Sequence, residues 1–213
     1  MQDAASQGAA EAGVQAALVA RDLYCRRGER PLFGGLNITL EAGEALHLVG
    51  PNGIGKTSLL QMLAGLRKPA RHGSFNAAGP PGDVLWQGIV SYLEDRTALD
   101  AELPLADALA FWARLDGRPV RLEPYGLADL ADVPVRYLST GQRRRAGFAR
   151  LSLQRADHWL LDEPLNGLDT QGCGMVESLI AEKREAGGIV IVASHQPIAV
   201  PGLRTLDLRD HPW

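Results

Sequence analysis

The stretch from Gly50 to Ser58, which reads GPNGIGKTS, constrains the fold of this chain more than any other feature. It follows an apolar run, residues 45–49, and opens a helical pattern, residues 59–64. A strand, a glycine loop and a helix in this order are the context in which the pattern G-x-x-x-x-G-K-[ST] indicates a phosphate-binding P-loop. The alternative is a glycine-rich turn without a ligand, and Lys56 and Thr57, in register with the pattern, argue against it.

The chemistry of phosphate binding explains the residue types in this loop. Gly53 and Gly55 let the backbone turn so that successive N–H groups point inward at phosphate oxygens, and the following helix directs its positive end at the same anion. Lys56 is expected to reach the β- and γ-phosphates of ATP and to take part in catalysis, and the Thr57 hydroxyl to ligate Mg²⁺. The predicted nucleotide-binding residues are Gly50, Pro51, Asn52, Gly53, Ile54, Gly55, Lys56, Thr57 and Ser58.

The composition of the 213 residues narrows the class of protein. The hydrophobic share of 46% is enough for a sizeable core, and the length predicts a single domain at 18–213 behind a disordered extension at 1–17. The net charge of −3 gives no sign of the basic surface that binds nucleic acid. The two cysteines, Cys25 and Cys173, lie far apart, which favours a reducing cytosol over a disulfide framework or a zinc site. No run approaches the ~18 apolar residues that span a bilayer, so no direct membrane insertion is expected.

The order of the predicted elements gives an α/β fold. Residues 18–25 and 36–40 are typical of strands, which predicts a small antiparallel β part before the P-loop core. Apolar residues recur at helical spacing over 104–115, and prolines punctuate residues 119–134. The sequence therefore predicts a mostly helical sub-domain inserted at about 94–137.

A second candidate anion site lies at residues 138–142, LSTGQ, just ahead of three arginines at 143–145. The Ser139 hydroxyl and the Gly141 backbone, together with Gln142, are suited to bind an anion at a helix start. A helix cap without a ligand is the alternative. The arginines suggest nucleic acid, but a solvated helix face agrees better with the net acidity of the chain.

Two carboxylates follow the apolar run 158–161. An acid at the carboxyl end of a strand beside a P-loop is where Mg²⁺ is held, so Asp162 is expected to ligate the metal. Glu163 fits the base that orients or deprotonates the attacking water, and solvated acids at a strand end are the alternative. His195 follows another buried strand, 189–193, at the edge where ligands bind in open α/β sheets, which favours a functional role.

The order and spacing of these motifs resemble the ATP-binding subunit of ABC transporters over nearly the whole chain from Leu18. The motifs are the P-loop, LSTGQ, LLDEP at 160–164 and His195. The run LSTGQRRR at 138–145 and Trp159 ahead of the acid pair are similar to one subfamily, the ATP-binding subunit of the cytochrome c maturation haem exporter. The resemblance implies a P-loop NTPase core of the ABC ATPase type, with ATP and Mg²⁺ as cofactors.

The chain departs from the family's pattern at three positions. The family usually stacks an aromatic ring on adenine after the first strand, and by spacing that position is Arg27, whose guanidinium can also stack on a base. The family's glutamine at the start of the helical insertion falls near Asp95, which implies a carboxylate contact to the metal there. Thr140 replaces a small residue in the LSTGQ signature, where it could crowd the approach of a phosphate.

The implied function is ATP hydrolysis coupled to transport, with haem export for c-type cytochrome biogenesis as the specific case. Two copies would sandwich two ATP molecules, each held by one P-loop and the opposite LSTGQ. Integral membrane subunits would dock on the helical insertion at the cytoplasmic face of the inner membrane. Another small ABC exporter, a soluble ABC ATPase acting on DNA, the ribosome or an assembly scaffold, and a non-catalytic nucleotide-gated module are the alternatives. Glu163 argues against the last, and a nucleotide kinase would leave LSTGQ and His195 unexplained.

Overall fold

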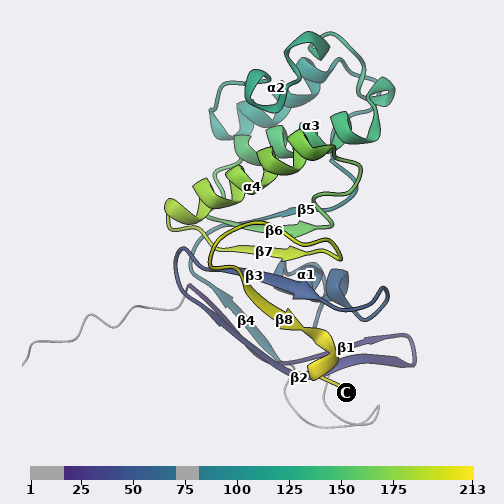
Figure 1. Ribbon diagram of the computed structural model, residues 1–213, viewed down its shortest axis with the longest axis vertical. Helices are drawn as coiled ribbons and strands as arrows, with labels where there is room; N and C mark the ends of the chain where they lie inside the picture. Colours follow the sequence, from purple (N-terminus) through teal and green to yellow (C-terminus); the bar gives the residue numbers. More distant parts are fainter. Residues whose placement is uncertain (1–16, 71–81) are drawn as a thin grey trace, which may run out of the picture.

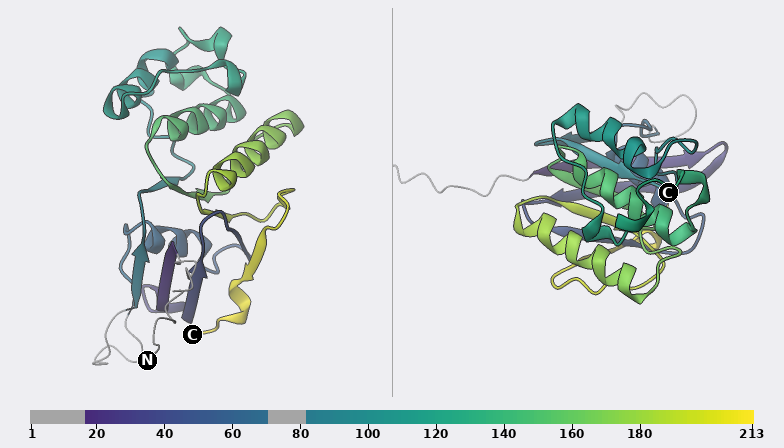
Figure 2. Two further views of the ribbon diagram at one scale, coloured as in Figure 1. Left: turned by 90° about the vertical axis from the view of Figure 1, so that its left-hand side faces the viewer. Right: turned by 90° about the horizontal axis from the view of Figure 1, so that it is seen from above.

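A central parallel sheet lies between a helical layer and a smaller antiparallel sheet (Figure 1). The computed structural model describes residues 17–70 and 82–213 of the chain. Figure 2 shows the same division from the side, with the helical layer at one end of the molecule and the sheets at the other. Among the described residues, no helix combines the length and the apolar character needed to cross a bilayer.

The parallel sheet has the strand order β5-β6-β7-β3-β8. Its strands are β3 Ala45–Val49, β5 Val90–Leu93, β6 His158–Asp162, β7 Val190–Ala193 and β8 Arg204–Asp207. β6 and β7 are buried along their whole length, which is typical of parallel strands covered on both faces. Because all five strands are parallel, their carboxyl ends meet at one edge, and the P-loop, Asp162 and the segment after Ala193 all leave the sheet there.

The antiparallel sheet has the order β2-β1-β4. Its strands are β1 Leu18–Arg27, β2 Arg30–Leu40 and β4 Asp83–Trp86. β1 and β2 form a hairpin in which Arg27 pairs with Arg30, and Gly28, with φ of 60°, supplies the left-handed conformation that such a tight turn requires. The hairpin therefore brings Arg27 to the end of the antiparallel sheet.

The P-loop helix, α1 Lys56–Leu63, packs in the core between the two sheets. Its Leu59, Leu60 and Leu63 are buried with apolar side chains of β1, β2, β3 and β7. Successive residues of a strand point to opposite faces, so Ile191 joins this core while Val192 joins the one on the other face. α1 is thereby fixed against the sheet from which the P-loop emerges.

The helical layer covers the other face of the parallel sheet (Figure 1). It contains α2 Leu105–Asp116, α3 Thr140–Leu153 and α4 Thr170–Glu185, with the short 3₁₀ turns η1 Glu123–Tyr125, η2 Ala128–Leu130 and η3 Val135–Tyr137 between α2 and α3. α2 ends at Gly117, whose φ of 63° gives the left-handed C-cap that favours glycine. The elements between β5 and α3 are thus helical, in the part of the sequence where an insertion is expected.

Three local features differ from the sequence expectations. Ala17 is buried, and its N–H donates to Leu40 O at 2.9 Å, so it belongs to the folded sheet and not to an extension; the remaining positions 1–16 lie outside the described residues. β2 begins well before the expected Leu36. The sequence did not predict β8, which closes the parallel sheet beside β3 and is followed by η4 Leu208–Asp210.

Candidate functional site

The P-loop connects β3 to α1 through three glycines with positive φ. Gly50, Gly53 and Gly55 have φ of 131°, 79° and 120°, conformations that residues with a Cβ rarely adopt. A Cβ at Gly55 would also lie 3.0 Å from the Phe33 ring of β2. The loop conformation expected from the sequence therefore requires glycine for backbone reasons and, at Gly55, for close packing as well.

Lys56 is buried and turns back across the loop. Its Nζ donates to Gly50 O at 2.7 Å and lies 3.4 Å from Pro51 O. The Ile54 side chain packs beside Gly50, so that a Cβ added at Gly50 would lie 3.2 Å from it. Two carbonyl groups thus hold the ammonium inside the loop, and an ammonium with three donors retains capacity for an anion there.

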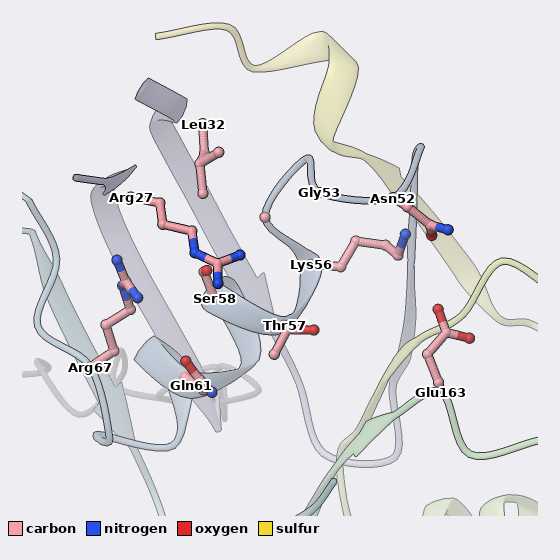
Figure 3. A pocket seen from close by; sticks show the side chains of 11 residues that line it. Arg27, Leu32, Asn52, Gly53, Lys56, Thr57, Ser58, Gln61, Arg67 and Glu163 are labelled. Atoms are coloured by element: carbon pink, nitrogen blue, oxygen red, sulfur yellow. The ribbon is translucent and has the colours of Figure 1, made fainter. Parts of the chain in front are cut away.

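A cavity of about 430 Å³ opens beside this loop (Figure 3). It is lined by Arg27, Leu32, Asn52, Gly53, Gly55, Lys56, Thr57, Ser58, Gln61, Arg67 and Glu163. In Figure 3, Glu163 lies across from Lys56, and Arg27 and Arg67 lie at the far end. The cavity therefore joins the P-loop to the Glu163 carboxylate, just after β6, at one end and to two guanidinium groups at the other.

Asp162 ends β6 next to the P-loop helix and is buried. Burial raises the pKa of its carboxyl, and hydrogen bonds from Thr57 and Tyr92 oppose that rise. The Tyr92 hydroxyl donates to Asp162 Oδ2 at 3.3 Å, and burial also raises the pKa of this phenol. Thr57 and Asp162 thus present neighbouring oxygen donors, the ligand type that Mg²⁺ prefers.

Glu163 directly follows β6 and has a φ of 46°, a conformation that is uncommon for a residue with a side chain and that the surrounding structure must hold in place. Its N–H donates to Ala193 O at 2.8 Å, which ties this turn to the end of β7. Its Oε2 lies 2.8 Å from His195 Nδ1 and 3.5 Å from His195 N. The structure therefore brings together Glu163, which the sequence indicated as the base, and His195, for which the sequence favoured a functional role.

The end of the cavity away from Glu163 contains residues that sequence reasoning missed. Arg67, which follows α1, donates from Nη2 to Arg26 O at 2.6 Å, and Gln61 lines the wall from α1. Arg27 lies here, as its spacing predicts, whereas Tyr24 packs against Trp213 with ring centroids 5.3 Å apart and does not line the cavity. The run from Leu59 to Lys68 gave no signal for these contacts, because they depend on where β1 crosses α1.

The LSTGQ residues do not line this cavity. Ser139 is the N-cap of α3: its Oγ accepts from Gln142 N at 3.2 Å, and Gln142 Oε1 accepts from Ser139 N at 2.8 Å. A Cβ at Gly141 would lie 2.7 Å from Gly167 O, so only glycine fits there. LSTGQ thus forms the helix cap that the sequence offered as the alternative. No residue of the motif lines the cavity of its own chain.

Asp95 forms an ion pair with α3 in this structure, and the metal-ligand role that the resemblance implies for it stays a prediction. Its side chain is 95% exposed and pairs with the buried Arg144, at 3.1 Å between Oδ1 and Nη2. It lines a different cavity, together with Arg96 and Arg143. Arg144, a buried residue of α3, also donates to Glu94 O at 3.0 Å. It therefore fixes the segment that carries Asp95.

Comparisons with known proteins agree with this geometry. Residues 33–166 match the ABC transporter family. The chain is 49% identical over 195 residues to the cytochrome c biogenesis ATP-binding export protein CcmA of Novosphingobium aromaticivorans, covering 91% of this chain and 96% of that protein. It is 45% identical over 200 residues to the protein of the same name from Rhodospirillum rubrum, covering 89% and 84%.

The fold is also similar to a solved structure of an ABC transporter ATP-binding protein from Pyrococcus furiosus. The TM-score is 0.75 at 26% identity, covering 92% of this chain and 99% of that one. These findings confirm the resemblance that the motifs carried. The chain therefore belongs to the ABC transporter family, and within it to the cytochrome c biogenesis ATP-binding export proteins of the CcmA type.

Proposed function

We propose that this chain binds ATP with Mg²⁺ in the P-loop cavity and hydrolyses the ATP to drive haem export for c-type cytochrome biogenesis. One observation supports the chemistry above all: Lys56 and Thr57 share a cavity with Glu163, whose carboxylate contacts His195. The export role is supported by the relatives, which are named cytochrome c biogenesis ATP-binding export proteins. Phosphate release from ATP by the purified chain tests the assignment, and no release in the presence of Mg²⁺ would contradict it.

The metal site consists of the Thr57 hydroxyl and the Asp162 carboxylate. Mg²⁺ is usually held by one or two protein oxygens together with substrate phosphates and water, which these two donors match. The raised pKa of Asp162 fits this role, because a bound cation stabilises the charged form that burial disfavours. When bound, the metal neutralises charge that develops on the phosphate oxygens.

Three side chains have separate roles in the hydrolysis. Lys56 keeps its hydrogen bond to Gly50 O and directs the donor capacity that its carbonyl contacts leave over at the phosphates. Glu163 accepts the proton of the attacking water or orients that water toward the γ-phosphate. His195 holds the Glu163 carboxylate through its ring and its backbone N–H.

The nucleobase binds at the end of the cavity lined by Arg27, Leu32 and Arg67. A guanidinium can stack on any base, since every base presents a π-face, and it confines the base less than an aromatic ring does. We therefore expect GTP to compete for the site within about tenfold of ATP, equivalent to about 1.4 kcal/mol. Displacement of a fluorescent ATP analogue measures this ratio. Arg27→Tyr is the matched variant and should bind both nucleotides more tightly. A strong preference of the wild type for ATP would contradict the proposed weak stacking of the base on Arg27.

A second copy completes the site in an ATP sandwich. The support is that Ser139, Gly141 and Gln142 form a helix start suited to an anion, yet none of them lines the cavity of its own chain. Their anion is then the γ-phosphate on a partner copy. Thr140 packs against Gly167: a Cβ added at Gly167 would lie only 2.8 Å from the Thr140 methyl group. The side chain that was expected to crowd the phosphate therefore packs against its own chain.

The sandwich predicts a nucleotide-dependent change of mass. The Glu163→Gln protein, which should hold ATP without hydrolysing it, is expected to dimerise with ATP and Mg²⁺ and to remain monomeric with ADP, because only a γ-phosphate bridges the two chains. Light scattering measures the mass in each nucleotide. The double variant Lys56→Ala, Glu163→Gln is the control and should stay monomeric throughout. The same mass for Glu163→Gln in both nucleotides would argue against the sandwich.

The membrane partners dock on the helical part of the chain, at the cytoplasmic face of the inner membrane. The support is a cavity of about 470 Å³ lined by the segment 95–99 and by Arg136 and Arg143. Asp95, the ion-pair partner of Arg144, also lines this cavity, so the cavity borders the segment that leads from β5 toward α2. Its guanidinium groups favour a partner segment that carries carboxylates.

A further inference from the structure

A histidine is buried in the strand that leads into the P-loop. His47 lies in the middle of β3, between Leu46 and Leu48, and is among the buried polar residues of the chain. Its Nε2 lies 3.1 Å from Ser194 O. A carbonyl oxygen only accepts, so Nε2 carries the proton and donates it. Burial lowers the pKa of this imidazole, and the hydrogen bond to Ser194 O and the charge of Glu163 oppose that shift only in part, so the ring is a neutral donor at neutral pH.

The acceptor of this hydrogen bond begins the segment that holds Glu163. Ser194 follows β7, and its own N–H points at Leu48 O at 3.4 Å, so β3 contacts both backbone groups of this residue. The next residue is His195, whose backbone N–H and ring nitrogen both contact Glu163 Oε2. A continuous series of contacts therefore runs from the P-loop strand to the carboxylate.

We infer that His47 is a positioning residue that fixes the Ser194–His195 segment to the P-loop strand and so keeps the Glu163 carboxylate aimed at the cavity. The inference rests on the proposed hydrolysis of ATP by Glu163. The alternative is a core histidine whose only contribution is overall stability. The two differ in what they predict for turnover, because His47 does not line the cavity and has no direct contact to offer a nucleotide.

Three variants of His47 separate these roles. His47→Gln places an amide N–H at about the reach of imidazole Nε2 and keeps a donor for Ser194 O. His47→Asn is also polar, but its amide is too short for that contact, and His47→Leu fills the core without a donor. We expect kcat for ATP to fall about tenfold in the Asn and Leu variants, with KM within about twofold of wild type. The Gln variant should keep kcat within about twofold of wild type.

A second measurement reports on the segment itself without any turnover. Hydrogen exchange of the His195 and Gln196 backbone amides should be faster in His47→Asn than in His47→Gln at equal thermal stability, because only the former releases Ser194 O. Unchanged kcat and unchanged exchange in both the Asn and the Leu variant would overturn the inference. A raised KM with normal kcat would also overturn it. If the wild-type protein releases no phosphate, the proposed function fails, and the exchange result alone still decides whether His47 fixes the segment.

Discussion

The Glu163→Gln protein is expected to release phosphate from ATP at least about a hundredfold more slowly than wild type, the usual scale for a positioned base. An amide cannot accept the proton of the attacking water, whereas the P-loop and Thr57 remain intact and keep ATP bound. The side chain that changes is isosteric, and His195 N–H can still donate to an amide oxygen at this position. Steady-state phosphate release and equilibrium ATP binding, measured on the same preparation, separate the two effects.

A matched control removes a carboxylate that has no part in the site. Glu185→Gln changes an exposed residue at the last position of α4 and should leave both turnover and binding at wild-type levels. Near wild-type phosphate release by Glu163→Gln would contradict the role of Glu163 as base. Loss of ATP binding together with turnover would instead indicate that the carboxylate supports the shape of the cavity.

Local patterns sufficed to predict the elements that carry the site. The P-loop, the apolar strand before Asp162 and the buried strand before His195 are each indicated by hydrophobic runs or glycine spacing, and the structure places all three at one sheet edge. Parallel strands make this convergence predictable, because their carboxyl ends share an edge. The sequence placed Glu163 and His195 each at the end of a buried strand, and the structure adds the 2.8 Å contact between them.

Other features depend on tertiary contacts that no local pattern encodes. β8 was missed because Arg204–Asp207 is short and mostly polar, and it becomes a strand only by pairing with β3 at the sheet edge. Arg67 reaches the cavity because its guanidinium binds the backbone of Arg26 on another element. Asp95 was assigned to the metal by a resemblance in position alone, and no local pattern indicated its ion pair with the buried Arg144 on α3.

The Lys56→Ala protein is expected to lose ATP affinity by about a hundredfold or more, equivalent to about 2.7 kcal/mol, within the range for a hydrogen bond between charged groups. The substitution removes the buried cation of the loop and leaves Gly50 O and Pro51 O without their donor. Lys68→Ala is the matched control, since this lysine is exposed beyond α1 and does not line the cavity. Binding of a fluorescent ATP analogue measures both variants, and wild-type affinity in Lys56→Ala would contradict the phosphate-binding role.

The central claim is that ATP turnover at this cavity supports c-type cytochrome biogenesis, and haem-stained gels test it most directly. A strain whose only copy carries Lys56→Ala is compared with one that carries Lys68→Ala, after both proteins are shown to accumulate equally. We predict that the Lys56→Ala strain loses its holo-c-type cytochromes and keeps its b-type cytochromes, while the Lys68→Ala strain keeps both. Normal c-type bands in the Lys56→Ala strain would contradict the proposed role in biogenesis.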